Sequence, residues 1–186
     1  MHHTLYKDVI DFLYEKNTQE ADYLLLLFAT GARKNELAEL PVRDIKFLES
    51  DNSSLISLLL KKTKNSEART ARIFIQNAEN AIKRIIEGKD LDDYVFYDSG
   101  TLYGICDLKP ICDELKEHFH LDHFTAHDAR HSFAVFLYKQ TKELNVVKRR
   151  LGHKSLKQTQ TYLASLDILE EEEDDMLDDT LSQSFA

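Results

Sequence analysis

The chain has 186 residues, of which 42% are hydrophobic, and it carries a formal net charge of −9 at pH 7. This length and hydrophobic content suffice for the core of one ordinary globular domain, so we expect a single domain. No apolar run reaches the length that a bilayer span requires, and five glycines and two prolines leave no long flexible linker. The composition therefore excludes a membrane-spanning protein and indicates a soluble one.

The two cysteines, Cys106 and Cys112, are isolated in the sequence. They fit neither a disulfide framework nor the paired spacing of zinc ligands. The chain does not open with the basic, apolar and small-residue pattern that is typical of a signal peptide. A reducing, cytoplasmic location is therefore expected.

The negative charge is concentrated near the C-terminus. Nine acidic residues and no basic ones lie between Asp167 and Asp179, so the rest of the chain is formally neutral. Within that remainder, residues 61–72 carry five basic side chains against one acid, and residues 139–157 carry seven against one. These two basic patches can neutralise phosphates, so the acidic total does not exclude a nucleic-acid partner.

The first forty residues have the apolar spacing of helices. That spacing predicts helices over residues 4–16 and 19–29, with Gly31 at the end of the second. Arg33 then lies at the entry to a short helix that Pro41 ends. The arginine is therefore predicted at a loop-to-helix junction.

The helical period disappears between residues 44 and 76, where apolar stretches alternate with polar turns. This pattern predicts a three-stranded antiparallel sheet, with strands over residues 45–48, 55–60 and 73–75 and turns at 51–53 and 64–67. Helices are expected again over residues 77–87 and 107–119, with an irregular stretch between them.

Two helix starts later in the chain have the spacing of a capping box. Thr125 precedes Asp128 by three residues, and Ser155 precedes Gln158 by three. The first begins a helix with a mostly apolar inner stripe, and the second begins a short helix that carries Tyr162. Both starts therefore lie beside candidate functional residues.

Three boxes resemble those of the tyrosine recombinases of the phage integrase type, and they occur in that family's order. Residues 29–37, Ala-Thr-Gly-Ala-Arg-Lys-Asn-Glu-Leu, resemble the box around the family's first catalytic arginine, which is Arg33 in this sequence. Residues 127–134, His-Asp-Ala-Arg-His-Ser-Phe-Ala, resemble its H-x-x-R box. Leu-Gly-His at residues 151–153, followed nine positions later by Tyr162, resembles its final box.

The resemblance implies an α+β class, mostly helical, with the tyrosine-recombinase catalytic fold and a small three-stranded antiparallel sheet. It implies a catalytic domain over residues 1–166 and an acidic C-terminal tail over residues 167–186. Family members usually carry a separate helical DNA-binding domain ahead of the catalytic one. Here the catalytic part begins almost at Met1, so a core-binding domain is expected to be absent from this chain, and weak, salt-sensitive DNA binding is expected from the chain alone.

Arginine pairs suit phosphodiester chemistry for a physical reason. A phosphodiester gains concentrated charge in a five-coordinate transition state, which two fixed guanidinium groups can stabilise through their forked donors. Arg33 and Arg130 are the candidates for this role. His127 lies three residues before Arg130, so both can face one phosphate, where His127 would manage a proton near the nucleophile. His153 follows Gly152 on a turn and would add a neutral or charged donor.

The resemblance also implies how the reaction proceeds. Tyr162 would attack phosphorus through its phenolic oxygen, giving a covalent 3′-phosphotyrosyl intermediate and a free 5′-hydroxyl. Lys64, in the predicted hairpin where the family places a catalytic lysine, would protonate the leaving oxygen, although Lys61 and Lys62 stand nearby. Neither a metal ion nor a cofactor is expected. The expected partners are double-stranded DNA and further copies of the chain, in a tetramer.

Two other functions involve similar residues. A type IB topoisomerase uses a similar catalytic set but rejoins the original strand. A catalytically silent DNA-binding or regulatory module is the alternative from a different class. The five residues Arg33, His127, Arg130, His153 and Tyr162 are all intact, which argues against a silent module.

Four histidines raise a competing hypothesis of a zinc site: His118, His120, His123 and His127. The last two are four residues apart, like helical zinc ligands. However, no Glu stands where a metalloprotease general base would lie, and the neighbouring Arg130 would repel a cation. We therefore expect no metal site, and the first three histidines are interpreted as solvated loop or helix-end residues.

The acidic tail also contains apolar residues, among them Ile168, Leu177 and Phe185. One hypothesis is that the tail packs against a neighbouring protomer, because family members often exchange a C-terminal segment. A second is that it folds over the basic face of its own domain as a DNA mimic. A disordered, solubilising tail is the third interpretation.

Overall fold

The computed structural model describes residues 3–50, 53–61, 63, 66–73, 76–96 and 107–165. Lys64, Cys106 and the tail lie outside these residues. None of the described helices is long and apolar enough to cross a membrane. The elements are α1 (His3–Lys16), α2 (Gln19–Thr30), α3 (Lys34–Ala38), a 3-10 turn (Val42–Asp44), β1 (Ile45–Ser50), β2 (Ser53–Leu60), β3 (Arg69–Ile73), α4 (Gln76–Ile86), α5 (Lys109–His118), α6 (Ala126–Thr141), α7 (Leu144–Leu151) and α8 (Leu156–Ala164).

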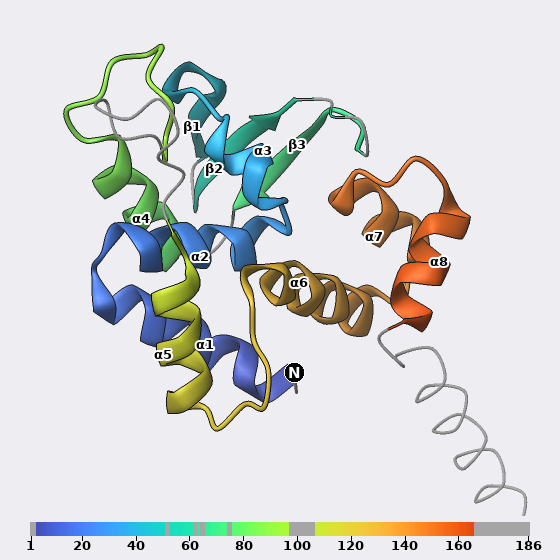
Figure 1. The fold of residues 1–186 in the computed structure, drawn as a ribbon. Coiled ribbons are helices and arrows are strands. Elements are labelled where there is room, and N and C mark those ends of the chain that lie inside the picture. The colour runs from blue at the N-terminus through green and yellow to red at the C-terminus, as the bar shows by residue number, and fades with distance from the viewer. Residues whose placement is uncertain are drawn as a thin grey trace, which may run out of the picture.

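Helix α2 lies at the centre of the larger core. Each of its residues from Ala21 to Thr30 is buried, because α1, α4 and α6 pack around it (Figure 1). The buried carboxylate of Asp22 is paired with the guanidinium of Arg84 on α4, whose Nε donates to it at 3.1 Å. The apolar run that predicted this helix is therefore the centre of the fold.

The three strands form the predicted antiparallel sheet, and their order in it is β1-β2-β3. Ile56 and Leu58 of β2 lie opposite Ile73 and Ala71 of β3, and all four side chains are buried. The expected start of the third strand is wrong, because β3 begins at Arg69 rather than at residue 73. Its alternating burial places an arginine at an inward position, and a charged residue there hid the strand pattern.

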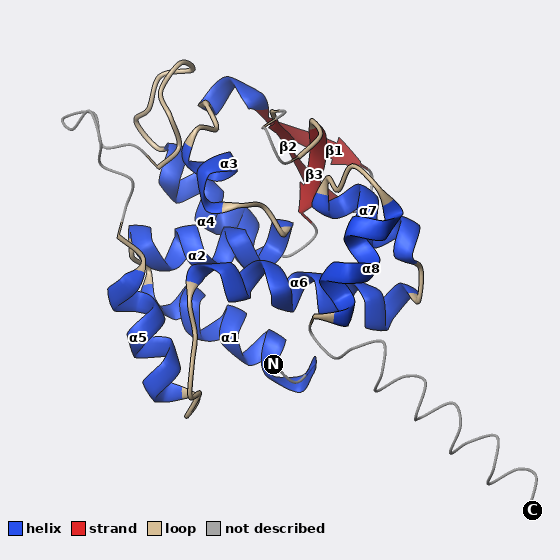
Figure 2. Cartoon of the chain, turned by 45° about the vertical axis from the view of Figure 1, so that its right-hand side comes forward, coloured by secondary structure: helices blue, strands red, loops and turns tan. Residues whose placement is uncertain are grey.

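Helices α6, α7 and α8 enclose a second, smaller core at one side of the molecule (Figure 2). Helix α6 takes part in both cores, since Ala129 near its start belongs to the larger one. The sequence analysis predicted no helix at α7, a stretch of eight residues in which three consecutive basic residues interrupt the apolar ones. The buried side chains of the smaller core are Ala134, Val135, Tyr138, Val147, Leu151 and Leu163.

The predicted helix ends beside the candidate residues are confirmed. Gly31 ends α2 in the left-handed conformation, at φ 62°. The backbone N–H and the hydroxyl of Thr125 both donate to the Asp128 carboxylate at 2.7 Å, at the start of α6. The Ser155 hydroxyl accepts from the backbone N–H of Gln158 at 3.2 Å, at the start of α8. The turns that carry the candidate residues are therefore held by local hydrogen bonds.

Substituting Gly31 by alanine should destabilise the fold strongly. A Cβ atom there would lie 2.2 Å from Cδ1 of Phe133, on a backbone that already disfavours a side chain. We expect Gly31→Ala to lower the free energy of unfolding by about 2 to 4 kcal/mol, from strain and overpacking together. Urea unfolding of the wild type and the variant, monitored by circular dichroism, measures this difference in the free energy of unfolding.

Gly88 provides the matched control for this substitution. It also has a positive φ, of 74°, but a Cβ atom there would meet nothing within 4 Å. Gly88→Ala should therefore lose only about 1 to 2 kcal/mol, from backbone strain alone. Equal losses for the two variants would show that the contact with Phe133 contributes nothing.

Candidate active site

Arg33 lies in the turn between α2 and α3. Its backbone is extended as the cap of α3, and its N–H donates to Oε2 of Glu36 at 2.7 Å. The guanidinium Nη1 lies 3.3 Å from Oε1 of the same carboxylate. Glu36 therefore holds both the backbone and the side chain of Arg33, and the predicted loop-to-helix junction is confirmed.

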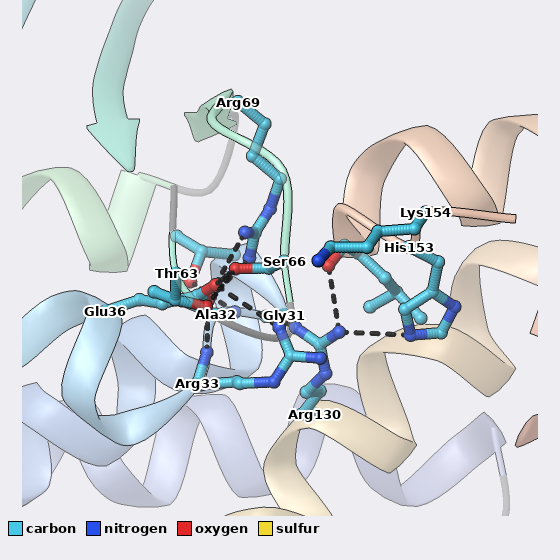
Figure 3. A network of polar contacts seen from close by, with 12 residues as sticks. Gly31, Ala32, Arg33, Glu36, Thr63, Ser66, Arg69, Arg130, His153 and Lys154 are labelled. Carbon is cyan, nitrogen blue, oxygen red and sulfur yellow. Dashed lines mark hydrogen bonds and ion pairs between the residues drawn. The ribbon is translucent and has the colours of Figure 1, made fainter. Parts of the chain in front are cut away.

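Arg130 on α6 is a fully buried arginine with 1% of its surface exposed. Its Nη1 donates to the carbonyl oxygen of Gly31 at 2.5 Å, and its Nη2 donates to that of Leu151 at 2.8 Å (Figure 3). Nη2 also lies 3.2 Å from Nε2 of His153. Arg130 thus joins the end of α2 to the end of α7 through uncharged partners.

The guanidinium groups of Arg33 and Arg130 point into the same space (Figure 3), and the charge of Arg33 acts on Arg130. Burial, together with the charges of Arg33 and Arg69, lowers the pKa of Arg130 to about 10. An arginine with that pKa is still charged at neutral pH. Three arginines therefore meet around the carboxylate of Glu36 in one partly buried space, and the excess positive charge favours an anionic ligand (Figure 3).

Burial raises the pKa of Glu36, but the opposing effects are larger. Hydrogen bonds and charge from Arg69, with further hydrogen bonds from the Arg33 backbone and the Ser66 hydroxyl, bring the pKa down to about 2. The Ser66 hydroxyl donates to Oε1 at 2.5 Å. Glu36 is therefore ionised under all ordinary conditions. The sequence analysis gave no role to Glu36.

His153 follows Gly152, which ends α7 in the left-handed conformation at φ 69°. Its Nδ1 lies 2.9 Å from the hydroxyl of Thr159, and its Nε2 lies beside Arg130. Since arginine has no acceptor, Nε2 must accept from Arg130, and Nδ1 carries the proton and donates to Thr159. In this arrangement Nε2 of His153 can donate to a phosphate only if the ring is protonated or if its contact with Arg130 is lost.

The electrostatic surroundings of His153 favour its neutral form. Burial lowers its pKa, and the charges of Arg130 and Arg33 lower it further, to about 4. A buried imidazole that accepts from one arginine and lies near another is costly to protonate. His153 is therefore neutral at pH 7 in the free protein.

Tyr162 on α8 lies against two of the histidines. Its ring is stacked on His131, with centroids 4.9 Å apart, and meets His153 edge to face at 5.3 Å. Its buried hydroxyl has no hydrogen-bond partner among the described residues. Burial raises the pKa of Tyr162 to about 12, against the charges of Arg130 and Arg33, which lower it. The phenol is therefore neutral, and it lies near Arg130, which lowers its pKa although the hydroxyl makes no well-aligned hydrogen bond to it.

His127 and His131 face each other on the first turns of α6, with ring centroids 4.4 Å apart. Burial and the charge of Arg130 lower the pKa of His127. Burial and the charge of His127 lower the pKa of His131, whose Nδ1 has no hydrogen-bond partner among the described residues. Two imidazoles that favour their neutral forms thus lie together, and one of them, His131, is stacked on Tyr162. The sequence analysis gave a role to His127 and none to His131.

The fold brings five of the six predicted site residues into one place, from segments far apart in the chain. Arg33 and Arg130 both act on the pKa values of His127, His153 and Tyr162, so the five form one electrostatic group. The sixth, Lys64, lies outside the described residues, and its assignment stays a prediction.

A basic pocket of about 860 Å³ opens beside this group, between β3 and α7. Burial and the charges of Arg72 and Arg149 lower the pKa of Arg150, so the cations repel one another. In the part of the chain that the structure describes, Arg72, Lys148 and Arg149 take part in no ion pair. The five basic residues that line the pocket are Arg69, Arg72, Lys148, Arg149 and Arg150.

The histidines of the zinc hypothesis point to different surroundings. The ring of His118 packs on Phe12, with centroids 4.5 Å apart. Nε2 of His123 lies 4.0 Å from the Asp128 carboxylate, while His127 meets His131. Among the described residues, no three His, Cys, Asp or Glu side chains gather where they could hold one metal ion.

Residues 1–167 match the model of the phage integrase family. The chain belongs to this family. Tyrosine recombinase XerA of Saccharolobus solfataricus is 30% identical over 158 residues, which cover 79% of this chain and 46% of that protein. Tyrosine recombinase XerC of Rickettsia canadensis is 32% identical over 148 residues, covering 75% and 45%. The chain thus spans about half the length of the curated integrase-family relatives it matches.

Solved structures of the phage integrase family have the same fold. The XerH site-specific recombinase bound to its difH substrate, in a pre-cleavage complex, has a TM-score of 0.70 with 22% identity over 88% of this chain and 49% of that one. The XerA recombinase has a TM-score of 0.62 with 20% identity over 87% and 57%. The predicted α+β fold, mostly helical with a three-stranded antiparallel sheet, is confirmed.

The lowered pKa of His153 predicts that acid destabilises this integrase-family domain. Unfolding restores the ordinary pKa near 6.5, so the unfolded chain takes up a proton more readily than the folded one. The contribution to stability is full above pH 6.5 and is lost as the pH falls toward 4. We expect the free energy of unfolding to fall by about 1 to 2 kcal/mol between pH 7 and pH 5 from this residue.

Denaturant unfolding at the two pH values measures this loss. His153→Gln should make the loss smaller, whereas His123→Gln, at an exposed histidine, should leave it unchanged. The role of His153 is refuted if both variants retain the full pH dependence of the wild type.

Proposed function

We propose that this domain is the catalytic part of a site-specific DNA recombinase or integrase, which cleaves and rejoins strands through a covalent 3′-phosphotyrosyl intermediate. The observation that carries the proposal is the meeting of Arg33, Arg130 and Tyr162 from three separate segments. A phenol beside two guanidiniums suits in-line attack on a phosphodiester, because the positive charge stabilises the transition state. Family membership supports the same reaction.

Each residue has a defined part in the proposed cleavage. The phenolic oxygen of Tyr162 forms a bond to phosphorus while the bond from phosphorus to the 5′-oxygen breaks. Arg33 and Arg130 hold the nonbridging oxygens. His127, which favours its neutral form, receives the phenolic proton, and Lys64 gives a proton to the departing 5′-oxygen. Because the phosphotyrosine conserves the bond energy, a 5′-hydroxyl can reverse the step without a cofactor or metal.

We propose double-stranded DNA as the partner, held partly in the basic pocket beside His153. Five cations line that pocket, and three of them have no ion pair among the described residues, so phosphates would relieve their mutual repulsion. The XerH structure with its difH substrate supports a DNA partner. Assembly into a tetramer on DNA, with the C-terminal tail as a possible contact, belongs to the same proposal, as does a cytoplasmic location.

Incubation with a nicked suicide substrate, followed by a denaturing gel, tests the proposed chemistry. Wild type should form a covalent protein–DNA adduct. Tyr162→Phe should reduce it at least about 10⁴-fold, as expected for the loss of a covalent nucleophile. An adduct of equal yield in both would reject Tyr162, and a wild type that binds DNA without an adduct would favour the silent module. Rejoining of the original strand alone, with none to a new 5′-hydroxyl, would favour a topoisomerase.

Neutralising single basic residues of the pocket should weaken DNA binding and make the affinity less dependent on salt concentration. Each of Arg72→Gln, Lys148→Gln and Arg149→Gln should reduce the slope of log affinity against log salt by about 1, because one phosphate contact is lost. Gel-shift titrations at several salt concentrations measure it. The control is Lys109→Gln on α5, which lies away from α7 in both views (Figures 1 and 2) and pairs with Asp113 at 2.6 Å. Identical slopes for pocket and control variants would refute the pocket.

A further inference from the structure

Arg69 is a buried arginine at the start of β3 to which the sequence analysis gave no role. Its Nη1 and Nη2 donate to the two oxygens of the Glu36 carboxylate at 2.9 and 2.8 Å (Figure 3). The side chains are 6% and 1% exposed, so this forked pair is almost fully removed from water. Its Nε donates to the carbonyl oxygen of Arg150 at 2.9 Å. One side chain therefore joins β3 to both α3 and α7.

The carboxylate that Arg69 grips also holds the candidate phosphate ligand Arg33. Glu36 accepts from the Arg33 backbone and pairs with its guanidinium, as described above. Because both carboxylate oxygens are fixed by the fork, the first turn of α3 cannot rotate freely against β3. Arg69 therefore constrains where Arg33 lies.

The turn that carries His153 rests on the same arginine. A Cβ atom at Gly152 would lie 2.9 Å from Nη1 of Arg69, so the glycine backbone packs directly on this guanidinium. The backbone N–H of Glu67, two residues before Arg69, donates to the carbonyl oxygen of Gly152 at 3.1 Å. The position of His153 therefore also depends on Arg69.

We infer that Arg69 is a positioning residue for the reaction: it fixes the spacing between the turn of Arg33 and the turn of His153 around one phosphate. The inference rests on the proposed function. Three of its nitrogens are already engaged by protein acceptors, so its part is to hold the groups that touch the phosphate. Lysine cannot replace it, because an ammonium group has neither a planar fork nor a second arm for the Arg150 carbonyl.

The test compares adduct formation on two nicked substrates, one with a phosphodiester and one with a methylphosphonate at the scissile position. A methylphosphonate has no negative charge, so its reaction depends less on well-placed guanidiniums. Relative to wild type on the same substrate, Arg69→Met should lose about 100-fold on the phosphodiester, the usual effect of a displacement of about 1 Å. On the methylphosphonate its loss should be at least about tenfold smaller, since that phosphorus needs less charge stabilisation.

Arg84→Met is the matched control. Arg84 also forms an ion pair with a buried carboxylate, Asp22, but joins α4 to α2 in the larger core. Its loss should lower stability, measured by urea unfolding, and change the two adduct rates by the same factor. Arg69→Lys keeps the positive charge but lacks the two parallel donors of the guanidinium, so it should show the same substrate-dependent loss as Arg69→Met. It replaces the methionine variant in the test if that variant does not fold.

Different results of this experiment would refute the role of Arg69 and the proposed recombinase reaction. Equal losses on the two substrates for Arg69→Met would mean a merely structural role and would overturn the inference, as would full activity of Arg69→Lys. A wild type that forms no adduct refutes the proposed function, and the inference falls with it. A substrate-dependent loss in both Arg69 variants, with none in Arg84→Met, supports the inference.

Discussion

Burying the guanidinium of Arg130 is unfavourable, because it takes a charge out of water, and the fold offsets this with uncharged acceptors rather than with a carboxylate. The carbonyls of Gly31 and Leu151 compensate the N–H groups but do not cancel the charge. Glu36 is instead committed to Arg69 and Arg33. The site therefore keeps net positive charge in a partly desolvated space, where an anion interacts more strongly than it would in water.

Two polar groups beside this charge are left without partners among the described residues, namely the hydroxyl of Tyr162 and Nδ1 of His131. A buried group that makes no hydrogen bond lowers stability by a few kcal/mol at most, and such groups are rare in native proteins. Their location on facing, stacked rings next to Arg130 agrees with a site arranged for a ligand. Stability and function are thus in opposition at this point of the fold.

The residues that could be predicted from the sequence are those that occur in short, dense patterns. Arg33, His127, Arg130, His153 and Tyr162 lie within three boxes and beside capping or glycine signals, and the resemblance of these boxes to those of the family identified them. The remainder depends on contacts between segments distant in the chain. The partner of Arg69, for example, is 33 positions away, and its inward position on β3 contradicts the usual exposure of arginine. Helix α7 was missed for a related reason, since it is short and its apolar positions are buried only against α6 and α8.

The two hydrophobic cores divide the protein into parts that can unfold locally at different free energies. Tyr162 and the turn of His153 belong to the smaller group of α6, α7 and α8, whereas Arg33 belongs to the larger body around α2. Proteins open locally in cooperative units, and a unit with fewer buried apolar contacts is expected to open at a lower free energy. Tyr162, the proposed nucleophile, therefore lies in the part with the smaller core, which is joined to the rest by the shared helix α6 and by Arg69 and Arg130.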